Sequence, residues 1–161
     1  MLIVAFLLRV YAFFFKITKT FGSEEKMIKD VELSDTAGIA ELLRRLGYNT
    51  TQKLIESKLT TFDGSGDYKA MIDTEDGVIH GIIGAQLLNP LHTKGKTGRV
   101  TTLVFHESYR GNRGGKALVE AMNDYFKASG CLTSEVSGSV MQSQSKKFFS
   151  GLGYKEGEII Y

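Results

Sequence analysis

A glycine- and arginine-rich stretch, Y-R-G-N-R-G-G-K-A-L at 109–118, lies between an apolar run and a long amphipathic segment. These neighbours predict a strand before the stretch and a helix after it, so the stretch must turn the chain from one to the other. Such turns can bind phosphate, because free N–H groups at a helix start point outward and glycine lets a ligand come close. The alternative is a plain turn with solvated cations. Three cations within seven residues favour an anion.

Two common phosphate-binding motifs do not fit this stretch. A Walker P-loop requires glycine where Arg110 stands and Ser or Thr where Ala117 stands. A dinucleotide fingerprint requires glycine where Arg113 stands. The stretch is therefore not expected to be a P-loop or part of a dinucleotide-binding fold.

Composition indicates one globular domain of ordinary polarity. The chain has 161 residues, of which 42% are hydrophobic and 24% charged. The single cysteine, Cys131, excludes an intrachain disulfide and a four-cysteine zinc site, which favours a cytoplasmic location. Four of the 20 cations and two of the 18 acids lie in the first 26 residues, so the remaining chain is neutral. That balance argues against a nucleic-acid partner.

The first 15 residues are apolar except for Arg9, which is shorter than the ~20 residues that span a bilayer. This segment could be a membrane or partner anchor, an element packed on the core or on another subunit, or an upstream extension. We favour the extension, because a regular domain pattern starts at Met27. The predicted organisation is therefore an apolar extension at 1–26 and one domain at 27–161, with membrane contact possible only through 1–26.

Hydrophobic periodicity and turn residues predict ten elements in the domain. Strands are expected at 28–33, 68–73, 78–88, 99–106, 132–136 and 154–161, and helices at 34–46, 51–59, 115–130 and 143–152. The strands at 68–73 and 78–88 form a hairpin with an Asp-Gly turn. Strands outnumber crossover helices, so we expect a mixed α/β (α+β) fold with helices on both faces of a mostly antiparallel sheet.

The stretch at 103–118 resembles the central motif of the GCN5-related N-acetyltransferases (GNAT), Arg/Gln-x-x-Gly-x-Gly/Ala after a strand. Arg110 and Gly115 fall on the first and last positions of this pattern and Gly114 on its fifth, whereas Arg113 stands where the family has glycine. Residues 33–48 are similar to the family's first strand–helix unit, and F-F-S-G-L-G-Y at 148–154 is similar to its F-Y-x-x-L-G-F/Y. The resemblance covers residues 27–161.

The resemblance implies an enzyme that moves an acetyl group from acetyl-CoA to a small primary amine by direct attack in a ternary complex. It implies a sheet whose central strands splay apart, with the CoA pyrophosphate on the glycine-rich turn and the pantetheine arm along 103–105. The implied cofactor-binding residues are Leu103, Val104, Phe105, Arg110, Gly111, Asn112, Arg113, Gly114, Gly115, Lys116, Ser143 and Phe149.

The catalytic groups are less well marked. Phe149 stands where the family has its tyrosine acid, and a phenyl ring has no proton to give. This motivates an alternative, a CoA-binding protein with little or no catalysis. For an enzyme, His92 is the first candidate base, Glu135 the second, and Tyr154 a candidate acid. His92 and Tyr154 also have structural interpretations, as an exposed loop histidine and as a core or strand-start aromatic.

The remaining expectations concern partners and metals. Three scattered histidines predict no metal site. A homodimer is possible, and a cationic amine could be attracted by acids in the loop and hairpin, although solvated turn residues are the simpler interpretation. These acids are Asp63, Asp67, Asp73, Glu75 and Asp76.

Overall fold

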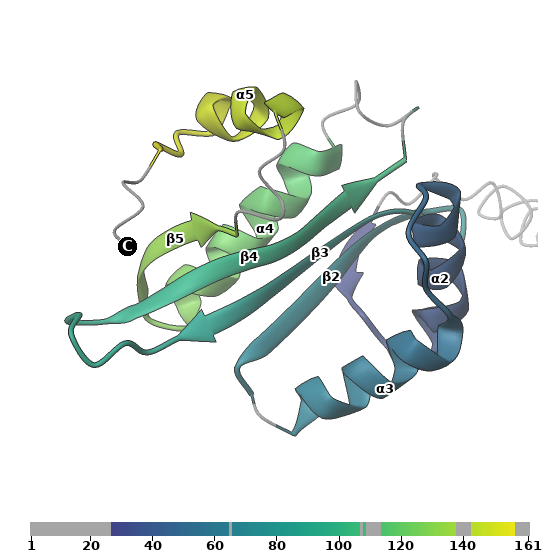
Figure 1. The fold of residues 1–161 in the computed structure, drawn as a ribbon, viewed down its shortest axis with the longest axis horizontal. Coiled ribbons are helices and arrows are strands. Elements are labelled where there is room, and N and C mark those ends of the chain that lie inside the picture. Colours follow the sequence, from purple (N-terminus) through teal and green to yellow (C-terminus); the bar gives the residue numbers. More distant parts are fainter. Residues whose placement is uncertain (1–26, 65, 107, 109–113, 138–142, 157–161) are drawn as a thin grey trace, which may run out of the picture.

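A computed structural model describes residues 27–64, 66–106, 108, 114–137 and 143–156 (Figure 1). The 1–26 extension and the predicted last strand thus lie almost wholly outside the described residues. The elements in chain order are β1 (Met27–Asp30), the 3-10 turn η1 (Leu33–Asp35), α2 (Thr36–Arg45), α3 (Gln52–Asp63), β2 (Tyr68–Glu75), β3 (Val78–Leu88), β4 (Lys96–Phe105), α4 (Gly114–Ala128), β5 (Cys131–Val136) and α5 (Ser143–Gly151).

The five described strands form one sheet in the order β1-β2-β3-β4-β5. The first three pairings are antiparallel and the β4–β5 pairing is parallel, which confirms a mixed, mostly antiparallel sheet. The Asp-Gly turn between β2 and β3 is also confirmed. Asp76 and Gly77 both have positive φ, at 51° and 76°, as a type I′ hairpin turn requires.

Helices cover both faces of this sheet, as predicted (Figure 1). On one face, α2 and the sheet share a core that includes Ile39, Ile72 and Val104. On the other, α4 and α5 pack on the sheet around Ile83, Met122 and a group of further buried side chains. No described helix is long and apolar enough to cross a membrane.

Strand β4 carries an irregularity at its centre. The pairing with β3 runs through Gly84↔Thr102 and then resumes at Ala85↔Val100, so Thr101 is an extra residue. Because side chains alternate along a strand, this bulge lets Val100 and Leu103 both pack in the α4 core although they are three positions apart. The Thr101 hydroxyl donates to the Gly84 carbonyl at 3.3 Å.

Candidate active site

The two central strands separate directly after this bulge. The parallel ladder of β4 and β5 ends at Val100↔Val136, followed by one hydrogen bond from Ser137 N to Val100 O at 2.8 Å. Within the described chain, the β5-side backbone of Thr101–Phe105 therefore has no strand partner. A free strand edge of this kind can pair with an extended ligand. The candidate residues Leu103, Val104 and Phe105 lie on this edge, which we call the open edge of β4.

The open edge leads to a helix that begins at two buried glycines, Gly114 and Gly115. A Cβ atom at Gly115 would lie 2.7 Å from Cε1 and 3.0 Å from Cζ of Phe105. Glycine is therefore required here to let the helix start pack against the end of β4. Lys116 is exposed, with Nζ 3.6 Å from Glu120.

Four of the predicted phosphate ligands cannot be assessed from this geometry. Arg110, Gly111, Asn112 and Arg113 lie outside the described residues, and their role stays a prediction. Ser143 begins α5, but its side chain is not described. Helix α4 begins at Gly114, in the region where the resemblance predicts the pyrophosphate, and the first N–H groups of a helix have no partner within that helix.

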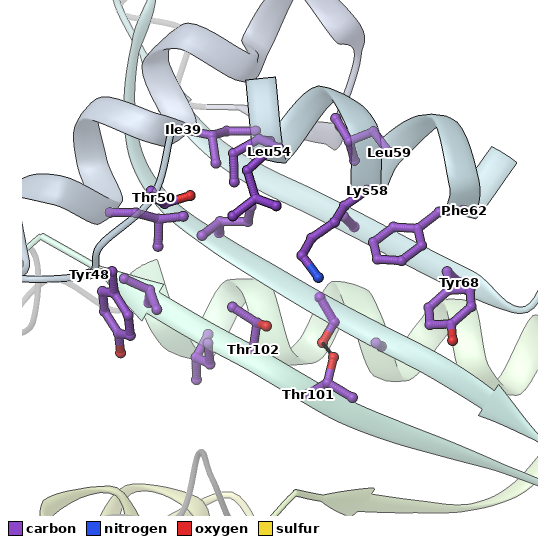
Figure 2. Close-up of a pocket in the computed structure, with 18 of the residues that line it drawn as sticks. Ile39, Tyr48, Thr50, Leu54, Lys58, Leu59, Phe62, Tyr68, Thr101 and Thr102 are labelled. Carbon is purple, nitrogen blue, oxygen red and sulfur yellow. Dashed lines mark hydrogen bonds between the residues drawn. The ribbon is translucent and has the colours of Figure 1, made fainter. Parts of the chain in front are cut away.

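A cavity of about 620 Å³ lies between α3 and the sheet, and we call it the α3 cavity (Figure 2). One wall is α3, another is the segment at 48–50, and the floor is formed by β2, β3 and residues 101–104 of β4. Its residues are Ile39, Leu43, Tyr48, Asn49, Thr50, Leu54, Ile55, Lys58, Leu59, Phe62, Tyr68, Lys69, Ala70, Ile82, Gly84, Ala85, Thr101, Thr102, Leu103, Val104 and Ser145. A molecule in this cavity would adjoin the open edge of β4.

The α3 cavity is apolar and aromatic at one end and lined by hydroxyls on the β4 side. Phe62 and Tyr68 stack with ring centroids 4.3 Å apart, and the Tyr68 hydroxyl accepts a hydrogen bond from Gln86 at 3.1 Å. Figure 2 shows Lys58 extending from α3 into the cavity, on the side where Thr101 and Thr102 of β4 lie. None of the described lining residues is Asp, Glu or His.

The structure does not bring His92 to this cavity. His92 is exposed in the loop between β3 and β4, four residues before β4 begins. The open edge is at the other end of β4. Lys96 and Leu103 are seven residues apart, which is about 23 Å along a strand. The prediction of His92 as the base is therefore corrected, because a base must come within hydrogen-bond reach of the amine.

Glu135 and Tyr154 are also absent from the lining of the α3 cavity. Glu135 pairs with Arg99, its register partner on β4, before the strands separate. The Tyr154 hydroxyl is 2.9 Å from Asn123 Oδ1 and 2.7 Å from the Ser134 hydroxyl. Its hydroxyl thus ties α4 to β5, and its role as acid stays a prediction.

Phe149 belongs to the core. Its ring is 1% exposed and meets Tyr154 edge to face at 5.4 Å, so it is not placed to contact a ligand on β4. Its neighbour Phe148 is only partly buried, with its ring 6.3 Å from that of Phe105. Phe148, and not Phe149, is thus the aromatic residue of this pair that lies near the end of β4.

The acids of the loop and hairpin, as far as their side chains are described, lie away from the α3 cavity. Asp67, Asp73, Glu75 and Asp76 do not line the α3 cavity, and the side chain of Asp63 is not described. Asp73 is 2% exposed on β2. No cluster of three or more metal-ligating side chains occurs in the part of the chain that the structure covers.

An open-edged mixed sheet, a glycine-started helix after β4 and an adjoining cavity define an acyltransferase fold of the GNAT type. The chain belongs to the acetyltransferase (GNAT) family, whose model matches residues 37–154. No curated protein sequence matches the chain.

Solved structures share the fold at low sequence identity. Arabidopsis thaliana glucosamine-6-phosphate N-acetyltransferase is 23% identical with a TM-score of 0.74, and the match covers 86% of this chain and 97% of that one. A Trypanosoma brucei acetyltransferase is 19% identical with a TM-score of 0.71, covering 85% and 97%. The aminoglycoside N-acetyltransferase AAC(6')-Iy in complex with CoA is 16% identical with a TM-score of 0.74, covering 88% and 95%.

Sequence reasoning missed Lys58, Phe62 and Tyr68. One signal could have found the lysine. Leu54, Lys58 and Phe62 are spaced by four residues and share one face of α3, so a charge interrupts an otherwise apolar stripe.

Proposed function

We propose that this protein transfers the acetyl group of acetyl-CoA to a primary amine by direct attack in a ternary complex. The observation that carries the proposal is the open edge of β4. The start of α4 follows the end of this edge, and the α3 cavity is lined by residues 101–104 of the same strand. These three features correspond to the three things the reaction needs. They are a backbone edge for the pantetheine, N–H groups for the pyrophosphate and a space for the amine.

In the proposed reaction, the pantetheine amides pair with the backbone between Thr101 and Phe105. An N–H group of that edge donates to the thioester oxygen and stabilises the negative charge that develops on it. The amine nitrogen attacks from the α3 cavity, so a C–N bond forms and the C–S bond breaks. The fold contributes mainly by positioning the two substrates.

Proton transfer in this proposal relies on water. The described lining of the α3 cavity holds no carboxylate and no imidazole, so the ammonium proton leaves to solvent. The amine then attacks as the free base, and the positive nitrogen of the new C–N bond loses a second proton to solvent to give the neutral amide. The CoA thiolate leaves and takes a proton from water, because the buried phenyl ring of Phe149 cannot provide one.

The direct test is release of free CoA thiol from acetyl-CoA in the presence of a broad panel of primary amines. We expect amine-dependent release, and the acetylated amine should appear in equal amount by mass spectrometry. S-acetylpantetheine, which lacks the pyrophosphate, should react with a much lower kcat/KM. Equal kcat/KM for the two donors would contradict the role of the helix start in binding phosphate.

A variant pair examines the glycine-rich turn. Replacing Arg110 and Arg113 with glutamine should weaken acetyl-CoA binding, measured by calorimetry, because two charge-assisted contacts to phosphate would be lost. The matched control is Arg45→Gln, since Arg45 is an exposed cation on α2 that pairs with Glu41. An equal change in affinity for both variants would mean that bulk charge, and not the turn, binds the cofactor.

A second candidate function is CoA binding with little or no catalysis. It is favoured by Phe149, which stands where the family has its tyrosine acid, and by the absence of a carboxylate or imidazole from the described cavity lining. If no amine of the panel causes release of CoA thiol but acetyl-CoA binds tightly, this alternative is favoured. If acetyl-CoA neither reacts nor binds, both the enzymatic and the CoA-binding function are contradicted.

The relatives do not decide the acceptor. One is named for an amino sugar phosphate and another for aminoglycosides, which differ in charge. Identities below 25% show the fold alone, so the acceptor has to be argued from the cavity of this chain.

A further inference from the structure

The position of Lys58 is unusual for a lysine in an amphipathic helix. It lies in line with Leu54 and Phe62 on the cavity face of α3, beside the partly buried Ile55 and Leu59. Lysines on a surface helix usually occupy the opposite, solvated face. Figure 2 shows the Lys58 side chain extending into the α3 cavity.

The charge of Lys58 has no partner among the described side chains. It makes no ion pair or hydrogen bond with the residues described, whereas Lys29, Lys116, Lys127 and Lys146 all have a carboxylate within 4.0 Å. The cavity lining offers no carboxylate among its described members. Lys58 is exposed, so water reaches its ammonium, and an anion in the cavity would be held by a direct charge-assisted hydrogen bond to that ammonium.

The second lysine of the lining is neutralised elsewhere. The Lys69 ammonium pairs with Asp30 of β1 and lies 5.0 Å from the centroid of the Tyr125 ring on α4. Asp30 and Tyr125 do not line the α3 cavity, so Lys69 contributes little free charge to it. Lys58 thus sets the electrostatic character of the cavity.

We propose that the acceptor is a primary amine that also carries an anionic group, a carboxylate or a phosphate. This inference rests on the proposed function. The anion binds the Lys58 ammonium at the α3 wall, and the amine points to the open edge of β4 across Thr101 and Thr102. The same cation repels polyamines, which would place further positive charge in a cavity with no described carboxylate to receive it.

The experiment uses matched pairs of amines that differ in one anionic group. Suitable pairs are O-phosphoethanolamine with ethanolamine, glucosamine 6-phosphate with glucosamine, and β-alanine with β-alaninamide; spermidine serves as the polycation. We expect the anionic member of at least one pair to exceed its partner about tenfold or more in kcat/KM, as a charge-assisted contact supplies. The pair that responds distinguishes phosphate from carboxylate.

Lys58→Met should reduce this preference to within about threefold, and Lys58→Arg should retain most of it. Methionine and lysine have similar helix propensities, so α3 is expected to persist. Lys53→Met is the matched control, because Lys53 is exposed on the same helix but does not line the cavity. The preference should also fall with added NaCl.

Binding of the same amines to the CoA-loaded protein, measured by calorimetry, keeps the test independent of turnover. If acetyl-CoA binds and no amine reacts, Lys58-dependent binding of an anionic amine supports the inference while the enzymatic proposal fails. The inference is overturned if neutral amines or spermidine react or bind as well as anionic ones. It is equally overturned if no anionic amine binds, or if Lys58→Met and Lys53→Met behave alike.

Discussion

Replacing Gly115 with alanine tests whether the helix start is as closely packed on β4 as the structure indicates. The new Cβ would lie 2.7, 3.0 and 3.2 Å from the Cε1, Cζ and Cδ1 atoms of Phe105. Contacts below 3.0 Å do not persist, so the ring or the helix must move. The Phe105 ring is also 6.3 Å from that of Phe148, which restricts the direction of movement.

The size of the effect follows from two opposing contributions. Forcing one extra carbon into a packed site costs about 1–3 kcal/mol. Alanine gains up to about 1 kcal/mol over glycine inside a helix, and less in the first turn, where Gly115 lies. We therefore expect a net loss of about 1–2 kcal/mol, or a fall in Tm of roughly 2–8 °C for a chain of this size.

The assay is urea denaturation of the full chain, with Gly151→Ala as the matched control. Gly151 ends α5, and a Cβ there would meet no atom within 4 Å, so alanine should be neutral or slightly stabilising. Phe105→Val removes the three ring atoms, and in that background the cost of Gly115→Ala should shrink by about 1 kcal/mol. The reasoning is refuted if Gly115→Ala is as stable as the natural chain, or if its cost is unchanged beside Phe105→Val.

Three further predictions concern single side chains. Tyr154→Phe should lower stability by about 1 kcal/mol in urea denaturation, because Ser134 and Asn123 each lose one hydrogen bond and keep the one between them. It should leave kcat within about threefold, and a 100-fold loss would support its role as the acid. The hydrogen bond and charge of Lys146 lower the pKa of Glu156, so the stability from this pair is present above the ordinary carboxyl pKa and is lost as pH falls through the lowered one. Lys146→Met should abolish that acid dependence in pH-resolved melting curves. Burial raises the pKa of the Cys131 thiol, partly opposed by the Lys96 charge, so alkylation at neutral pH should be slower than for a free cysteine, and a faster rate would contradict this.

The order and type of the described elements could be predicted because local chemistry specifies them. The Asp76-Gly77 turn adopts the positive φ angles that its residues favour, and α4 begins at the expected glycine pair. Boundaries were less predictable. The first strand was expected to reach residue 33 but ends at Asp30, because Asp35 accepts hydrogen bonds from Lys29 and from the Glu32 N–H and folds residues 33–35 into a 3-10 turn.

The candidate catalytic residues could not be placed because their position depends on the direction of a strand and on the extent of a helix. His92 is suited to proton transfer by type, yet β4 carries the chain from its loop to the opposite end of the sheet. In contrast, α3 was expected to end near residue 59 but continues to Asp63, and the added turn brings Phe62 onto Tyr68. Because α3 continues for this further turn, Lys58 lies between Leu54 and Phe62 on one face of the helix. In a helix that ended near residue 59, Lys58 would lie at the helix end. The tertiary pairing of Phe62 with Tyr68, which no local pattern encodes, is what makes this lysine part of a cavity wall.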